Sequence, residues 1–157
     1  MAKPRIFPDT GALLAIVAFP RDQRGKASLA GEVLQLYQAD EFDLVISQVV
    51  VDELDQVLAR DFPNERQRAQ AFLAPFTAQL TRLPTPQEIA AAFPFTTDEG
   101  DAPIFAAALI AHPGIVLSND FRAFHSPKAK KFWAEYKIQV ESLYGLLCVF
   151  GKRKRKG

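Results

Sequence analysis

The borders of apolar segments in this chain carry four carboxylates: Asp9, Glu53, Asp101 and Asp120. Burying one unpaired carboxylate is expensive, so acids are normally spread over polar faces. Several acids beside apolar elements imply a compensating cation, and their oxygen ligands suit Mg²⁺ or Mn²⁺. Each acid taken alone also has an ordinary interpretation as a turn residue, a helix cap or an exposed helix acid.

An alternation of strands and helices would bring these acids together. Short strands are predicted over residues 5–9, 43–46, 80–83, 115–118 and 138–140, with helical segments between them. This alternation predicts an α/β domain around a mostly parallel sheet. In such sheets binding sites lie beyond the carboxyl ends of strands, where Asp9 and Asp120 both fall. Asp101 begins an apolar helix, whose dipole favours a carboxylate at that end.

The helix predicted after Ser47 offers a choice among three acids. When its residues are placed at intervals of about 100°, Glu53 lies on the border of the apolar stripe. Asp52 points away from the stripe, and Asp55 borders its other side less closely. The pattern therefore favours Glu53 firmly over Asp52 but only slightly over Asp55.

Four short motifs follow one another in an order that resembles a PIN domain over roughly residues 5–145. They are Asp-Thr-Gly after the first strand, Ser-x-x-x-x-x-Glu-Leu-x-x-Val-Leu in a helix, Asp-x-Pro-Ile-x-Ala-Ala-Ala, and Leu-Ser-Asn-Asp. PIN domains are metal-dependent ribonucleases that include the toxins of VapBC-type toxin–antitoxin pairs. The resemblance implies a three-layer α/β/α domain over residues 1–150 with a mostly parallel central sheet. It also implies catalytic and metal-binding roles for Asp9, Glu53, Asp101 and Asp120.

The resemblance extends to supporting residues and shows two departures. Ser118 stands where the family usually has a hydroxyl beside the site, Thr10 belongs to the Asp-Thr-Gly motif, and Asp98 resembles an additional outer acid of some members. Pro8 replaces the usual strand-forming hydrophobic residue. Arg122 stands where many members carry another acid, so it either weakens a second metal site or contacts a substrate phosphate. One or two metal ions are therefore both compatible with the sequence.

Basic and aromatic residues alternate after the last acid. Positive charge beside aromatic rings suits single-stranded RNA, in which bases stack and phosphates pair with cations. The alternative is a solvated helix whose aromatic side chains face the core, which helical spacing favours. The basic residues are Arg122, Lys128, Lys130 and Lys131, and the aromatic residues are Phe124, Phe132 and Trp133.

The formal net charge of +1 conceals an asymmetry between the body of the chain and its end. Residues 152–156 hold five of the 19 basic residues, which leaves 14 bases against 18 acids elsewhere, a net charge of −4. Residues 151–157 are therefore predicted to be a basic, disordered tail, which is a common arrangement for contacting nucleic acid. A solubilising terminus is the alternative interpretation.

Composition excludes several other classes of protein. The longest apolar stretches are too short to cross a bilayer, so no membrane association is expected. The single cysteine rules out an intrachain disulfide and favours a reducing cytoplasm. Neither histidine has the spacing of a zinc site, and neither a Walker-type phosphate loop nor a Gly-x-Ser-x-Gly elbow is present.

These observations predict a cytoplasmic endoribonuclease that uses Mg²⁺ or Mn²⁺ to hydrolyse RNA phosphodiester bonds. The resemblance alone implies a homodimer and inhibition by a protein antitoxin. The alternative is a PIN-like RNA-binding or regulatory module with little turnover, and a third possibility is a DNA-directed nuclease of the same fold.

Overall fold

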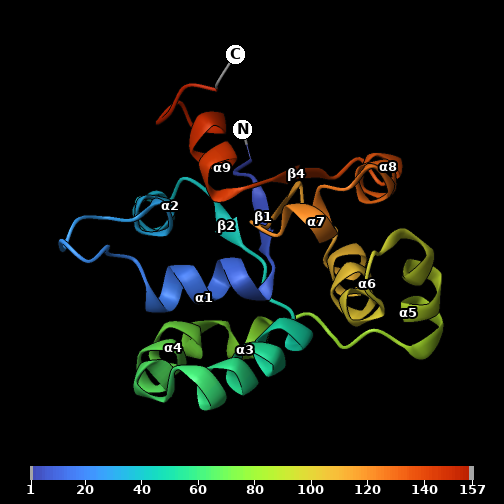
Figure 1. Ribbon diagram of the computed structural model, residues 1–157, viewed down its shortest axis with the longest axis horizontal. Coiled ribbons are helices and arrows are strands. Elements are labelled where there is room, and N and C mark those ends of the chain that lie inside the picture. Colours follow the sequence, from blue (N-terminus) through green and yellow to red (C-terminus); the bar gives the residue numbers. More distant parts are fainter. Residues whose placement is uncertain (1, 156–157) are drawn as a thin grey trace.

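A four-stranded parallel sheet lies at the centre of the molecule (Figure 1). The computed structural model describes residues 2–155. The strand order is β2-β1-β3-β4, and Ile6 of β1 lies opposite both Leu44 of β2 and Ile115 of β3. The strands are β1 Arg5–Pro8, β2 Asp43–Leu44, β3 Ile115–Leu117 and β4 Gln139–Glu141.

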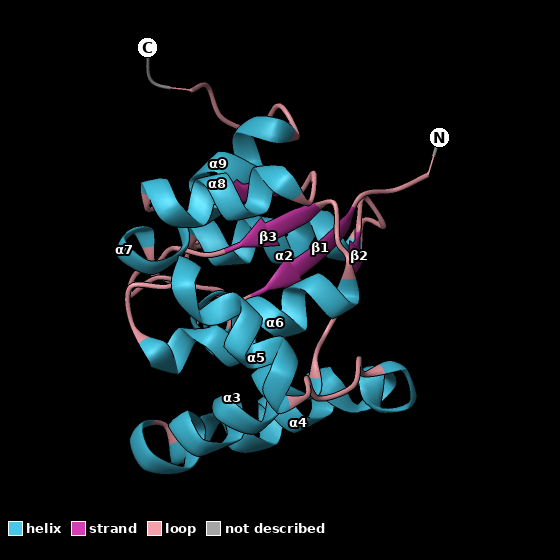
Figure 2. Cartoon of the chain, turned by 90° about the vertical axis from the view of Figure 1, so that its right-hand side faces the viewer, coloured by secondary structure: helices cyan, strands magenta, loops and turns pink. Residues whose placement is uncertain are grey.

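Helices cover the sheet from both sides. Figure 2 shows α8 and α9 on one side of the strands and α3 to α6 on the other, which confirms the predicted layered α/β architecture. The helices are α1 Thr10–Ala18, α2 Leu29–Gln38, α3 Gln48–Asp61, α4 Arg66–Leu73, α5 Pro86–Ala92, α6 Ala102–Ala111, α7 Phe121–Phe124, α8 Pro127–Glu135 and α9 Leu143–Val149. Because both faces are covered, Ile6, Phe7, Val116 and Leu117 are completely buried.

Pro8 ends β1 without breaking the sheet. Asp9 N donates to Leu117 O at 2.9 Å, and Val45 N donates to Ile6 O at 2.9 Å. Since alternate residues of a strand direct their N–H groups to opposite neighbours, the missing N–H of Pro8 faces the β2 side. β2 therefore ends two residues earlier than predicted, because Pro8 cannot donate the next ladder bond.

The prediction of a strand over residues 80–83 was wrong. Thr81 N donates to Ile46 O at 3.0 Å and Thr81 O accepts from Gln48 N at 3.1 Å, so a single bridge forms beside the start of α3. Pro84 follows and has no N–H to extend a ladder. The side chain of Leu83 is 54% exposed, so burial gives this segment no further support.

The aromatic residues that follow the last acid belong to the core. Phe124, Phe132 and Trp133 are each at most 2% exposed. They surround Phe105 of α6, with ring centroids 5.0, 5.6 and 4.7 Å from it. The helical spacing thus reports inward packing, and these three rings have no face open to an RNA base.

Gly31 in α2 lies against the backbone of the loop that follows α1. A Cβ at this position would be 1.8 Å from Pro20 O, which also accepts a hydrogen bond from Ser28 N at 3.0 Å.

We expect Gly31→Ala to lower the free energy of unfolding by about 1–3 kcal/mol, because a backbone neighbour cannot give way as a side chain can. Urea unfolding measures this loss. Gly114→Ala is the control, since its nearest neighbour would be 3.7 Å away; an equal loss there would contradict the steric explanation.

Residues 151–155 run back along the body of the molecule. Arg153 pairs with Glu32 of α2, Arg155 pairs with Glu141 at 2.9 Å, and Tyr144 donates its hydroxyl hydrogen to Lys154 O at 2.7 Å. Lys156 lies outside the described residues, and both disorder of this tail and a domain boundary at residue 150 stay predictions. Within residues 2–155, no helix has the length and apolar character needed to span a membrane.

Candidate metal centre

Asp9 stands where β1 passes into α1, and it is held from two directions. Its Oδ1 accepts from Ala12 N at 2.7 Å, which caps α1, and its Oδ2 accepts from the Ser118 hydroxyl. Both Asp9 and Ser118 are buried, at 6% and 0% exposed. Because Ser118 follows β3, this contact joins the carboxyl ends of the two central strands, which point towards α7 in Figure 2.

Asp120 is linked to the same hydroxyl. Its backbone N donates to Ser118 Oγ at 3.0 Å, and its Oδ1 accepts from Ala123 N at 3.0 Å, which caps α7. One hydroxyl thus contacts the side chain of the first acid and the backbone of the last, and the supporting role of Ser118 stays a prediction. Thr10, the other predicted hydroxyl, is buried, and its Oγ1 has no hydrogen-bond partner among the described residues.

Asp101 precedes α6, as predicted from its sequence position. No capping hydrogen bond to its side chain occurs within residues 2–155, so the carboxylate is not used to start the helix. Asp98 caps the preceding short 3₁₀ turn by accepting from Gly100 N at 2.9 Å. A pocket of about 260 Å³ opens between these acids and α7, lined by Thr97, Asp98, Asp101, Asp120, Arg122 and Ala123.

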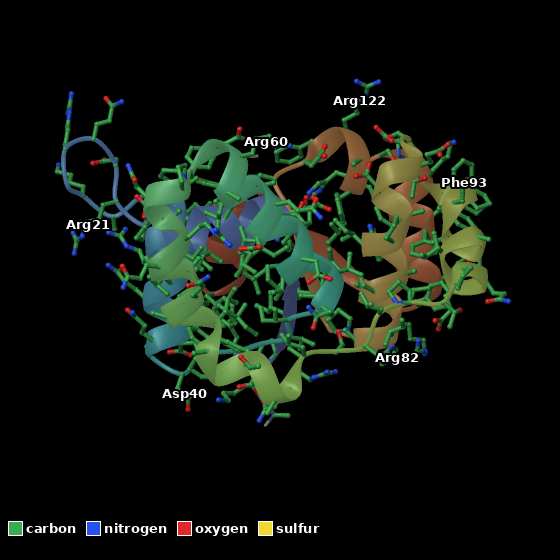
Figure 3. All side chains as sticks on the ribbon, turned by 90° about the horizontal axis from the view of Figure 1, so that it is seen from below. Arg21, Asp40, Arg60, Arg82, Phe93 and Arg122 are labelled. Carbon is green, nitrogen blue, oxygen red and sulfur yellow. The ribbon has the colours of Figure 1, made fainter. Side chains whose placement is uncertain are left out.

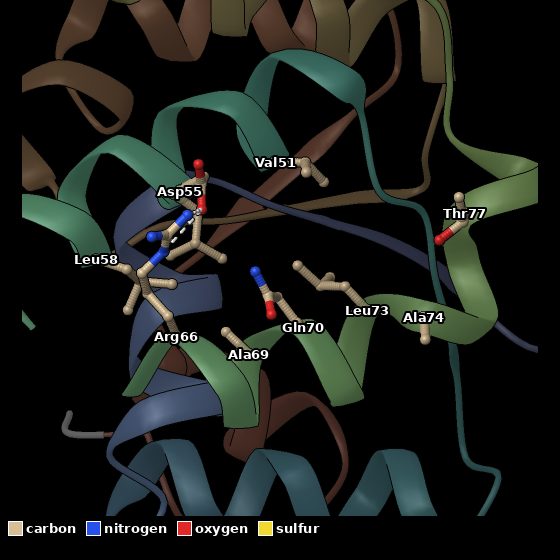
Figure 4. A pocket seen from close by; sticks show the side chains of 10 residues that line it. Val51, Asp55, Leu58, Arg66, Ala69, Gln70, Leu73, Ala74 and Thr77 are labelled. Atoms are coloured by element: carbon tan, nitrogen blue, oxygen red, sulfur yellow. Dashed lines mark hydrogen bonds and ion pairs between the residues drawn. The ribbon is translucent and has the colours of Figure 1, made fainter. Parts of the chain in front are cut away.

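The three acids of α3 have different surroundings. Glu53 is half-buried, whereas Asp52 and Asp55 are exposed. Asp52 accepts from Gln48 Nε2 at 2.7 Å, and Asp55 pairs with Arg66 of α4 at 2.9 Å (Figure 4). Among these three acids Glu53 is the least exposed, and its charge contributes to the raised pKa values of Asp9 and Asp101.

The pKa values show that these carboxylates share one electrostatic environment. Burial raises the pKa of Asp9 to about 6, opposed by the hydrogen bonds from Ser118 and Ala12 and reinforced by the charges of Asp120 and Glu53. Burial likewise raises the pKa of Asp101 to about 6, with further contributions from the charges of Asp120, Asp98 and Glu53. None of the four principal acids forms an ion pair with a lysine or arginine of residues 2–155, although Arg122 lines the same pocket as Asp101 and Asp120.

The donor set fits a hard divalent cation, although its members are not drawn tightly together. Hard cations prefer carboxylate and hydroxyl oxygens, and Mg²⁺ usually keeps several waters while contacting one or two carboxylates. Across residues 2–155, no three acidic, histidine or cysteine side chains are grouped closely enough to hold one ion directly. Ligation partly through water is the arrangement that these positions suit.

The model of one protein family, described as a PIN domain, matches residues 5–122 of this chain. The chain belongs to the PIN domain family. The matched segment contains all four principal acids and ends at Arg122. No curated protein matches the chain significantly. PIN domains are generally nucleases, so membership supports a nuclease-like hydrolase that acts on nucleic acid.

The predicted nucleic-acid-binding residues of this PIN domain fall in two places. Arg122 lines the acidic pocket and projects outward from α7 (Figure 3), a position from which it can meet a phosphate. Lys128, Lys130 and Lys131 are exposed on α8, and none of them lines the acidic pocket. The structure therefore places Arg122 at the acids, whereas the three lysines lie outside the acidic pocket on a separate helix.

Sequence reasoning missed two residues that shape this region of the PIN domain. Asn119 Oδ1 accepts from Leu143 N at 2.8 Å and ties the loop after β3 to α9. His125 Nε2 contacts Ser118 O at 2.8 Å, behind the hydroxyl that orients the acids. Asn119 lies between two candidate site residues, which could have drawn attention to it, whereas no local pattern marks His125.

Proposed function

We propose that this PIN domain is a metal-dependent endoribonuclease that hydrolyses RNA phosphodiester bonds with Mg²⁺ or Mn²⁺. The observation that carries the proposal is the pairing of buried Asp9 with Ser118, which also binds the backbone of Asp120. Three carboxylates, two of them with raised pKa values, and Glu53 then share a site in which none of them forms an ion pair with a described lysine or arginine. Such a site is costly unless a cation binds there.

In this proposal Asp9, Asp101 and Asp120 hold the principal ion, partly through water because they are not grouped closely enough for three direct contacts. Glu53 ligates the same ion through water or helps to hold a second one. When bound, the ion lowers the pKa of the attacking water and neutralises charge on the phosphate oxygens. Ser118 keeps the Asp9 carboxylate in one orientation. Asp98 acts from the outer edge of the pocket, and Arg122 pairs with a substrate phosphate.

A cleavage assay on a panel of single-stranded and structured RNAs tests the proposal. We expect cleavage with Mg²⁺ or Mn²⁺, loss of cleavage in EDTA, and recovery when the metal is restored. Asp120→Asn should reduce the rate by about 100-fold or more, because removing one group that stabilises transition-state charge has effects of this size. Cleavage that persists unchanged in EDTA would contradict the proposal, and preferred cleavage of single-stranded DNA would redirect it to that substrate.

The alternative function is an RNA-binding or regulatory module with little turnover. The loose grouping of the acids within residues 2–155 is the observation in its favour. Metal binding and RNA binding without cleavage would support this alternative over the nuclease.

A finer proposal is that the protein is the toxin of a toxin–antitoxin pair, acting in the cytoplasm as a homodimer that a protein antitoxin inhibits. It is supported by the resemblance to VapC-type PIN domains. A small overlapping reading frame upstream of this gene would give it independent support.

A further inference from the structure

A second pocket, of about 570 Å³, borders the same short helix that borders the acidic pocket. Asp120, Arg122 and Ala123 face the acidic pocket, whereas Phe121 and His125 face the second one. The two pockets therefore adjoin each other across α7. An RNA strand whose phosphate reaches Asp120 would meet Phe121 at the next residue.

Phe121 and His125 form an aromatic platform at the mouth of this second pocket. Their ring centroids are 4.6 Å apart with an interplanar angle of 34°. Phe121 is 59% exposed, the largest exposed fraction among the large hydrophobic residues described. The contact of His125 Nε2 with Ser118 O holds the His125 ring in place. The Phe121 ring therefore rests on a fixed neighbour. Exposed, pre-positioned rings are what nucleobases stack on.

The pocket offers a carboxylate that can contact a base and cations that can contact the phosphates on either side of it. Glu141 is only 8% exposed there, and its Oε2 accepts from Arg155 at 2.9 Å. A Cβ at Gly145 would lie 2.4 Å from Glu141 Oε1, so this glycine makes room for the carboxylate. The Glu141 carboxylate can accept N–H groups of a base, while Lys130 and Arg155, which also line the pocket, can pair with the RNA backbone.

We propose that the second pocket binds one nucleobase of single-stranded RNA. The base stacks on the Phe121 ring, next to the phosphodiester held at the acids. This inference rests on the proposed ribonuclease function. It replaces the RNA-stacking role that the buried rings of Phe124, Phe132 and Trp133 cannot have.

Binding of a fluorescein-labelled, mixed-sequence RNA decamer in EDTA tests the proposal without cleavage. We expect Phe121→Ala to weaken binding about tenfold or more, and Phe121→Tyr to stay within about twofold of wild type, because stacking needs a ring face. Phe93→Ala is the matched control, since Phe93 is 48% exposed and lies away from Arg122 in Figure 3. Thermal unfolding of each variant verifies that it is folded.

A set of decamers with one abasic nucleotide each locates the stacked base. Wild-type protein should lose affinity at a particular position, and Phe121→Ala should lose nothing further there. Equal binding by Phe121→Ala and wild type, or an equal loss in Phe93→Ala, would overturn the proposal. If wild type cleaves RNA but Phe121→Ala binds normally, only the base pocket fails. If wild type binds through Phe121 but never cleaves, the pocket stands and the nuclease proposal fails.

Discussion

Asp9→Asn is expected to abolish metal-dependent RNA cleavage while making the metal-free protein more stable at neutral pH. Losing a metal contact worth several kcal/mol of transition-state stabilisation should lower the cleavage rate by about 1,000-fold or more. Asparagine has nearly the same shape, and its Oδ1 can still accept from Ala12 N and so keep the α1 cap. The loss of activity should therefore not come from unfolding.

The stability gain follows from the direction of the Asp9 pKa shift. Its pKa is raised from 3.8 to about 6 in the folded protein, so folding disfavours the ionised form. The wild-type free energy of unfolding should thus fall as pH rises from about 4 to about 6, and Asn at this position removes the part of that fall that is due to Asp9. The upper bound is about 3 kcal/mol, since one pKa unit corresponds to about 1.4 kcal/mol.

Urea unfolding in EDTA at pH 4 and at pH 7.5 measures this effect. The variant should exceed wild type in stability at pH 7.5 and differ little at pH 4. Added Mg²⁺ should stabilise wild type and leave Asp9→Asn nearly unchanged, because only wild type has the full ligand set. Cleavage by Asp9→Asn at the wild-type rate would refute the role of Asp9. A variant that is less stable than wild type at pH 7.5 would refute the electrostatic argument.

Glu53→Gln should lower the cleavage rate about 10- to 100-fold, the size expected when a group that supports a metal site is neutralised. Glutamine retains the length of the side chain but not its charge. The half-buried position of Glu53 and its effect on the pKa values of Asp9 and Asp101 are the reasons for this expectation. The variant should also need more Mg²⁺ to reach its maximum rate.

Two neighbouring acids of α3 provide matched controls. Asp52→Asn and Asp55→Asn remove one carboxylate each from the same helix, but these carboxylates already contact Gln48 and Arg66. Both variants should cleave RNA at close to the wild-type rate over a full Mg²⁺ titration. A larger loss in either control than in Glu53→Gln would show that the wrong acid of α3 had been assigned.

Local patterns in the sequence were sufficient for most elements that position the site. Short apolar runs predicted β1 and β3, whose residues 6–8 and 115–117 are buried, and the N-cap before α3 forms as expected, with Ser47 accepting from Val50 N at 3.1 Å. The prediction of a strand over residues 80–83 failed because a strand needs a continuous ladder with a neighbouring segment, and Thr81 forms only one isolated bridge, with Ser47. The neighbour lies far away in the sequence, so local patterns do not reveal it. The edge strand β2 is shorter than predicted because Pro8 of the neighbouring strand has no N–H for the next ladder bond.

The features of the candidate site likewise fall into those that local sequence patterns predict and those that depend on contacts between distant residues. The carboxylates that end strands or begin helices could be identified from the amino-acid sequence, because hydrophobic periodicity and chain order contain that information. Three further points became visible in the folded molecule alone. Ser118 contacts Asp9, 109 residues away, Asp55 pairs with Arg66 whereas Glu53 is half-buried, and the aromatic rings of α7 and α8 belong to the core. Partner choice for a polar or aromatic side chain depends on what folding brings beside it, and no local spacing specifies that.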